Sequence, residues 1–179
     1  DHLTGATIPF NVVVQAAGGT LGAGTWAESN TYSGAVTLNG PLTLAGSRAN
    51  GGATSFTVTG QISGACPVTV NTTDQYQGGR GIVTLSNAGN DFAGTTLQMG
   101  YLKATSEGAL STGPITIYNP DSYSRLYLDK PTSADWTLTN NIISSGIIQV
   151  EDGSAGYTLN CSGSAVTVGA NGTTAATMT

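Results

Sequence analysis

The chain has 179 residues and a formal net charge of −5 at pH 7; only 8% of its residues are charged, while 39% are hydrophobic. Soluble domains average about 25% charged residues, so uncharged Thr, Ser, Asn and Gly must form most of this surface, and the hydrophobic share excludes a disordered composition. The acidic balance and five scattered basic residues argue against a nucleic-acid partner, and no run of about 18 apolar residues predicts a transmembrane helix.

The N-terminal residues 7–14 (TIPFNVVV) form the most hydrophobic run of the chain, and a Gly-rich stretch at 18–24 follows them. Two interpretations are open. The run either forms the first rung of its own core, or residues 1–20 extend onto a neighbouring copy, where strand addition supplies main-chain hydrogen bonds. In the second case the assembly strand comprises Ile8, Phe10, Val12, Val13 and Val14.

Short strands follow throughout the chain, marked by apolar–Thr–apolar triplets and separated by Gly, Asn, Ser or Pro. This alternation predicts one buried and one solvent-facing side. Thr116 and Thr137 should therefore be more exposed than their neighbours Ile115, Ile117, Trp136 and Leu138. Residues 106–110 (SEGAL) are the single helix candidate, and Gly108 argues against a helix there. The expected strands are 35–38, 41–45, 55–62, 67–71, 81–85, 95–98, 101–104, 114–118, 125–128, 135–139, 142–150, 156–160 and 164–168.

Two repeats run through these strands. Triplets begin at Ile115, Trp136 and Tyr157, 21 residues apart, and residues 30–34 (NTYSG) match residues 90–94 (NDFAG) at an offset of 60. A fixed period of about 20–30 residues is typical of a solenoid. We therefore expect one all-β solenoid domain over residues 1–179, with a β-sandwich as the alternative. Residues 170–179 are expected to form a flexible or strand-pairing tail.

The two fullest copies of this pattern, at residues 29–44 and 81–102, cover about a quarter of the chain. They resemble the autotransporter-associated β-strand repeat in passenger domains of bacterial surface proteins. The resemblance implies a right-handed parallel β-helix displayed outside a bacterial cell, with no chemistry in the repeat itself. If these residues are the whole protein, no segment is long enough for that family's membrane translocator, and the repeat serves another use.

The two cysteines, Cys66 and Cys161, are expected to form a disulfide because the composition is that of a secreted protein. The bond would be worth about 4–5 kcal/mol on the chain-entropy model. However, rungs 95 residues apart in a simple stack exceed the Cα separation of about 7 Å that a disulfide allows. Two separate buried thiols are therefore the alternative. The spacing and the single histidine give no zinc motif.

Residues suited to catalysis are few. His2, the only histidine, lies at the chain terminus, where nothing would hold it as a triad base. Glu151 and Asp152 are the only adjacent acidic pair, and the glycine that follows favours a solvated turn over a calcium or catalytic site. We expect no cofactor and no metal.

An insertion at residues 119–131 interrupts the regular spacing and is associated with Asp121, Asp129 and Asp135. Loops that project from a solenoid often carry its binding function. Three tyrosines there either pack over the flank of the solenoid, as we favour, or stack on sugar rings: Tyr118, Tyr123 and Tyr127. Four asparagines are expected to be turn residues or stacked ladders rather than ligands: Asn30, Asn90, Asn140 and Asn141.

Together these observations predict a non-enzymatic structural protein, secreted or on a bacterial cell surface, that assembles head to tail into a filament. Two alternatives remain: an adhesin fragment that binds glycans or cells, and a polysaccharide lyase-like β-helix.

Overall fold

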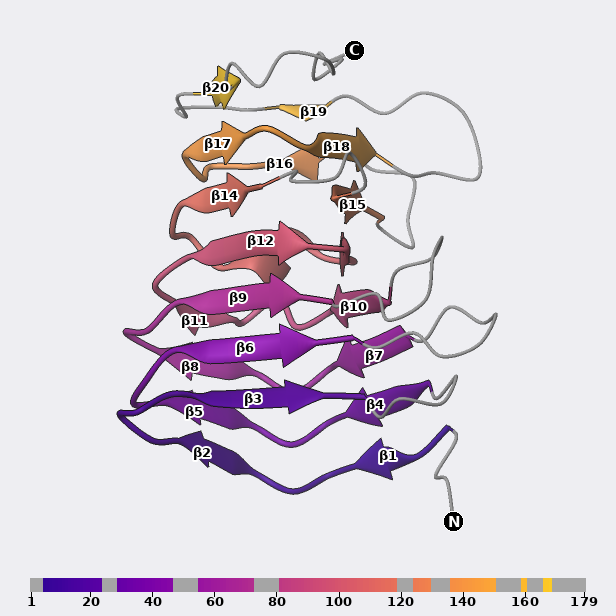
Figure 1. Cartoon of the computed structure of the whole chain (residues 1–179), viewed down its shortest axis with the longest axis vertical. Helices are drawn as coiled ribbons and strands as arrows, with labels where there is room; N and C mark the ends of the chain where they lie inside the picture. The colour runs from indigo at the N-terminus through magenta and orange to yellow at the C-terminus, as the bar shows by residue number, and fades with distance from the viewer. Residues whose placement is uncertain are drawn as a thin grey trace.

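The computed structural model describes residues 5–23, 29–46, 55–72, 81–118, 124–129, 136–150, 159–160 and 166–168. The chain coils into a parallel β-solenoid, in which each rung is one turn of the coil and places successive strands on different sheets (Figure 1). Every strand pair in the described residues is parallel. This confirms the solenoid and excludes the β-sandwich; the right-handed coil stays a prediction.

Three sheets run along the stack. Sheet 1 contains β1 (Thr7–Ile8), β4 (Asn30–Tyr32), β7 (Ser55–Val58), β10 (Ile82–Leu85), β13 (Tyr101–Ala104), β15 (Arg125–Leu128) and β18 (Ile147–Val150). Sheet 2 contains β2 (Val12–Val14), β5 (Val36–Leu38), β8 (Ile62–Gly64) and β11 (Asp91–Phe92). Sheet 3 contains β3 (Gly19–Gly22), β6 (Leu42–Ala45), β9 (Val68–Asn71), β12 (Thr95–Met99), β14 (Ile115–Ile117), β17 (Ile142–Ser144) and β20 (Val166–Val168).

Beyond β11 the second side of the coil changes. A 3₁₀ helix, η1 (Glu107–Leu110), lies between β13 and β14 in the chain, where earlier rungs have a strand of sheet 2. The next two rungs have β16 (Trp136–Thr137) and β19 (Leu159–Asn160) at this place in the chain, and these two strands pair with each other. The short helix therefore interrupts the second side of the stack.

The core is a column of aliphatic and aromatic side chains enclosed by the sheets. The inward residues of each triplet are buried, as in Val36 and Leu38 on β5, while Thr37 between them is exposed. The expected register is confirmed later in the chain: Ile115, Ile117, Trp136 and Leu138 are at most 2% exposed, and Thr116 and Thr137 are less buried. None of the helices in the described part is long and apolar enough to cross a membrane.

We expected no helix at residues 106–110, and this prediction was wrong, because Glu107–Leu110 form the 3₁₀ helix η1. Gly108 is needed there because a Cβ would lie 1.9 Å from the carbonyl oxygen of Ala88 in the rung below. The glycine marks a close approach between backbones and does not break the helical turn. In the adjacent part of η1, Ala109 and Leu110 are buried and continue the core column.

Candidate functional site

The N-terminal rung leaves one edge of each sheet open. Strands β1, β2 and β3 pair with β4, β5 and β6, and within the described residues they have no partner on the other side. Figure 1 shows these three strands together at the N-terminal end of the stack, drawn in indigo. An unpaired edge presents main-chain donors and acceptors to any strand that approaches.

Residues 7–14 form the first rung of their own core in this structure, which is the first of the two arrangements left open by the sequence. The Tyr32 hydroxyl donates to the carbonyl oxygen of Phe10, and the Ala35 amide donates to Asn11 Oδ1 at 2.9 Å. Val14 is 5% exposed and belongs to the core, with Ile8 and Val12 packed against it. Exchange of this segment between copies stays a prediction.

The ladder bonds identify which groups face the open edge. The Val12 amide donates to Ala35 at 2.9 Å, and the Val14 carbonyl accepts from Asn39 at 2.9 Å, so both residues are directed toward β5. Because alternate residues of a parallel strand bond to opposite neighbours, the main-chain groups of Val13 face outward. The same argument on β3 directs Thr20 outward, since the Gly19 amide donates to Pro41 at 3.0 Å.

A corner of the first rung is occupied by Phe10, whose side chain is 74% exposed. The pairing of β1 with β4 and of β2 with β5 places Phe10 at the same corner as Gly34, and the next rung has Gly60 there. A Cβ on Gly34 would lie 1.9 Å from the Phe10 oxygen, and a Cβ on Gly60 would lie 1.8 Å from the Gly34 oxygen. At these two rungs the close carbonyl of the rung beneath requires glycine, whereas no described residue lies beneath Phe10.

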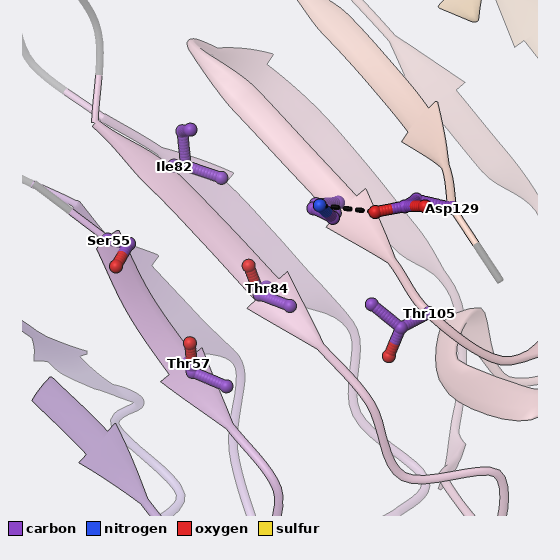
Figure 2. Close-up of a pocket in the computed structure, with 7 residues that line it drawn as sticks. Ser55, Thr57, Ile82, Thr84, Thr105 and Asp129 are labelled. Carbon is purple, nitrogen blue, oxygen red and sulfur yellow. Dashed lines mark ion pairs between the residues drawn. The ribbon is translucent and has the colours of Figure 1, made fainter. Parts of the chain in front are cut away.

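The outer face of sheet 1 carries a shallow hollow of about 530 Å³ that crosses β7, β10 and β13 and reaches Asp129, just after β15. Its lining is mostly hydroxyl-bearing, and Figure 2 shows side chains from successive strands directed to the same side. Lys103 and Asp129 close one side of it as an ion pair, and both are about 30% exposed. The full lining is Ser55, Thr57, Ile82, Thr84, Lys103, Thr105 and Asp129.

A tyrosine pair adjoins this hollow. Tyr127 lies in register with Lys103 on the neighbouring strand, and Tyr101 lies two residues before Lys103 on the same face of β13. Their ring centroids are 5.6 Å apart with planes at 76°, an edge-to-face contact. Tyr127 therefore packs against Tyr101 on the outer face of sheet 1, whereas Tyr118 is 54% exposed. Stacking of these rings on sugars stays the open alternative.

Three of the four asparagines bond through their side chains to main-chain groups of neighbouring rungs, and none of these bonds joins two asparagines in a ladder. Asn90 accepts from the Ile62 amide at 2.9 Å and donates to the Ala109 carbonyl at 2.8 Å, so it joins three rungs. Asn140 donates to the carbonyls of Ser111 and Gly113, and Asn30 accepts from Ala6 at 3.2 Å. Asn90 and Asn140 are buried and satisfy main-chain groups of neighbouring rungs, and the half-buried Asn30 does the same from β4.

Cys66 is a free, half-buried thiol between β8 and β9. Cys161 lies outside the described residues, but the strands on either side of it are β19 and β20. In sheet 3, β20 is four strands along from β9, which is about 19 Å at a spacing of about 4.8 Å. A bond within one chain would have to bridge much of that distance, and the Cys66–Cys161 disulfide stays a prediction.

Other candidate residues fall outside the description: His2, Asp121, Tyr123, Asp135, Glu151 and Asp152. Among the residues that are described, no three His, Cys, Asp or Glu side chains gather into a group that could hold a metal ion. Sequence reasoning missed the hollow on sheet 1. The signal was the small Ser and Thr residues at outward positions of β7 and β10, which becomes visible only once the strand register is known.

One family model matches residues 33–98, and it describes repeats of unknown function (DUF5649). No curated protein and no solved structure matches the chain. The matched segment runs from the corner before β5 into β12, so the repeat of that model is similar to consecutive rungs of this solenoid. The match supports a repetitive β-solenoid and gives no link to autotransporters.

Proposed function

We propose that this chain is a non-enzymatic extracellular structural protein whose copies join head to tail. The observation that carries the proposal is the similarity of the two ends. The first rung offers the open edges of β1, β2 and β3, and the last described rung ends with β18, β19 and β20 in the same chain order. A second copy placed end-on would extend the stack with parallel pairing, and such a contact propagates as an open filament.

The composition supports a place outside the cell or on a bacterial cell surface. Outward positions carry Thr and Ser more often than charged residues, and the whole chain has five Lys and Arg. Such a surface offers few sites to trypsin-like proteases. This argument concerns location alone and is independent of the end contacts.

The contact would join β2 and β3 of one copy to β19 and β20 of the next, rather than β1 to β18. Pro9 has no amide hydrogen and follows Ile8, whose carbonyl accepts from Ser33, so an outward donor is missing at this point. Phe10 excludes a tight corner beneath it. The connection from β18 to β19 is eight residues long, against three residues from β1 to β2.

The test uses proline at the outward positions of the open edge. Val13→Pro with Thr20→Pro removes two outward amides without removing a ladder bond to β5 or β6, because proline is tolerated at an edge where its nitrogen faces solvent. Val13→Thr is the matched control, since it removes the exposed apolar side chain and keeps the amide. Sedimentation velocity and negative-stain microscopy measure particle mass and length.

We expect filaments for the wild type and for Val13→Thr, and monomers for the double proline variant. A wild type that is monomeric at high concentration would overturn the proposal. So would filaments that the two prolines leave unchanged, provided that circular dichroism shows the variant to be folded.

A further inference from the structure

We propose that the hollow on the outer face of sheet 1 binds a linear, uncharged polysaccharide that lies along the axis of the solenoid. The inference is independent of the end-to-end contact, because the hollow lies on the side of the stack. It begins at β7, two rungs away from the open edge of β1.

The lining selects the chemistry of the ligand. Four of the seven lining residues present hydroxyl groups, and Ile82 is the one aliphatic side chain. A hydroxyl both donates and accepts hydrogen bonds, which matches the hydroxyls of a sugar. A purely apolar ligand would leave these groups without partners, at a cost in free energy.

The charges in the hollow are balanced. Lys103 Nζ is paired with the Asp129 carboxylate, so the hollow has no excess positive charge to attract phosphate or a polyanion. Each partner keeps further hydrogen-bonding capacity, since an ammonium has three donors and a carboxylate has several lone pairs. The pair therefore suits a neutral ligand with alternating donors and acceptors.

The shape of the hollow sets the direction of the ligand. It crosses β7, β10 and β13 and ends at Asp129 after β15. These strands are neighbours in sheet 1, and three steps of about 4.8 Å span about 14 Å along the axis. Thr57, Thr84 and Lys103 lie in register on these strands and each carries a hydrogen-bond donor. Their spacing is close to the repeat of an extended pyranose chain, so successive sugars would meet successive strands.

The tyrosines supply an apolar surface, which the hydroxyl groups of the hollow do not. Sugars have an apolar C–H face as well as hydroxyl edges, and aromatic rings with a polar tip pack against such amphipathic groups. Tyr127 and Tyr101 lie beside Lys103 at the end of the hollow. A chain running out of the hollow along the axis would pass over this ring pair.

The experiment is a titration of the ¹⁵N-labelled full chain, followed by amide chemical shifts. The probes are cellohexaose and chitohexaose as neutral chains, a hyaluronan octasaccharide as an acidic chain, and inorganic phosphate. The variant is Thr57→Val with Thr84→Val, which removes two hydroxyls from the hollow and keeps the β-branched shape. The matched control is Thr37→Val with Thr116→Val, which makes the same change on sheets 2 and 3.

We expect at least one neutral chain to shift amides of β7, β10 and β13 with a dissociation constant of about 1 mM or below. The Thr57/Thr84 variant should weaken this binding about fivefold or more, and the control should not. The proposal is overturned if neither neutral chain shifts these amides at about 10 mM. It is equally overturned if hyaluronan or phosphate alone binds there, or if both double variants bind like the wild type.

Discussion

At the scale of single residues, the corner between sheets 1 and 2 shows how closely the rungs approach. Gly34 and Gly60 each lie directly against a carbonyl oxygen of the preceding rung, and there is no room for a Cβ at either site. Phe10 is tolerated at the equivalent site because it belongs to the first rung. At the first three rungs, the residue at this corner therefore differs according to whether a described rung lies beneath it.

Gly60→Ala should destabilise the protein by about 1–3 kcal/mol, because the new methyl group would force the two backbones apart. The atom that it meets is a main-chain oxygen, which cannot rotate away as a side chain would. Denaturant unfolding measures the loss. Gly19→Ala is the control: its Cβ would meet only Val14 Cγ1, at 3.5 Å, and should change stability by less than about 0.5 kcal/mol. Equal stability of the two variants would contradict the close approach.

Tyr32 gives the first rung a dependence on pH. Burial raises the pKa of its phenol above the ordinary value of 10.0, and the hydroxyl donates to the Phe10 carbonyl. In the folded state the phenol therefore keeps its proton at a pH where the unfolded chain has released it. The resulting contribution to stability is present in full below the unfolded pKa and is lost as pH rises toward the folded value.

We expect the unfolding free energy of the wild type to fall as pH rises above about 10, and Tyr32→Phe to remove part of that slope. Denaturant midpoints measured across this range give both curves. Parallel curves for the two proteins would contradict the role of Tyr32.

At the scale of elements, the strands themselves could be predicted well from the sequence. Alternation gave the inward and outward residues of β5, β6, β9 and β14 correctly, because one buried face imposes a period of two. Two expected strands, 55–62 and 142–150, each proved to be two strands separated by a corner. A corner of two or three residues in a solenoid leaves little trace in hydropathy. The short strands β4 and β11 were missed because two or three residues are too few to show an alternating pattern.

The sequence repeats correspond to real strands, but the strand pairing that their spacing indicated was wrong. Ile115 pairs with Ile142, so the step from Ile115 to Trp136 joins strands on different sides of the coil. Trp136 pairs with Leu159, two residues beyond the Tyr157 that the repeat indicated. Likewise, residues 30–34 lead from sheet 1 into sheet 2, whereas residues 90–94 lead from sheet 2 into sheet 3. Each side of the coil uses the same strand–corner–strand pattern. Sequence similarity therefore revealed the fold class without giving the true pairing.

The core column predicts a contrast within one triplet. Leu138→Ala should cost about 2–5 kcal/mol, because Leu138 has no exposed surface and its removal leaves a cavity. Thr137→Ser should cost well under 1 kcal/mol, since it removes one methyl group that is only partly buried. Denaturant unfolding compares them. A larger loss for the threonine variant would show that the inward face is assigned wrongly.

At the scale of the whole molecule, each rung contacts only its neighbouring rungs. A change at one end of the stack therefore leaves the contacts in the middle intact. The hollow on sheet 1 could not be predicted from sequence because it joins residues from Ser55 to Asp129 through register alone. The open first rung could be anticipated from its apolar composition. The roles of Pro9 and Phe10 at this edge could not be predicted, since they depend on which main-chain groups of the next rung lie above them.

Removal of residues 1–23 tests whether the first rung limits association as well as permitting it. The deletion takes away β1, β2 and β3 and uncovers β4, β5 and β6, whose corner residue is Gly34. Because Pro9 and Phe10 are lost, we expect the shortened solenoid to associate end to end more strongly than the full chain, at equal concentration.

Gly34→Phe in the shortened chain restores the bulky corner and should return association toward the wild-type level. The same substitution in the full chain should destabilise it, because the Phe10 oxygen lies 1.9 Å from the new Cβ. Sedimentation velocity gives the first two results and denaturant unfolding the third. If the shortened chain is strictly monomeric, the corner does not limit stacking, and the first rung must itself supply the attractive surface.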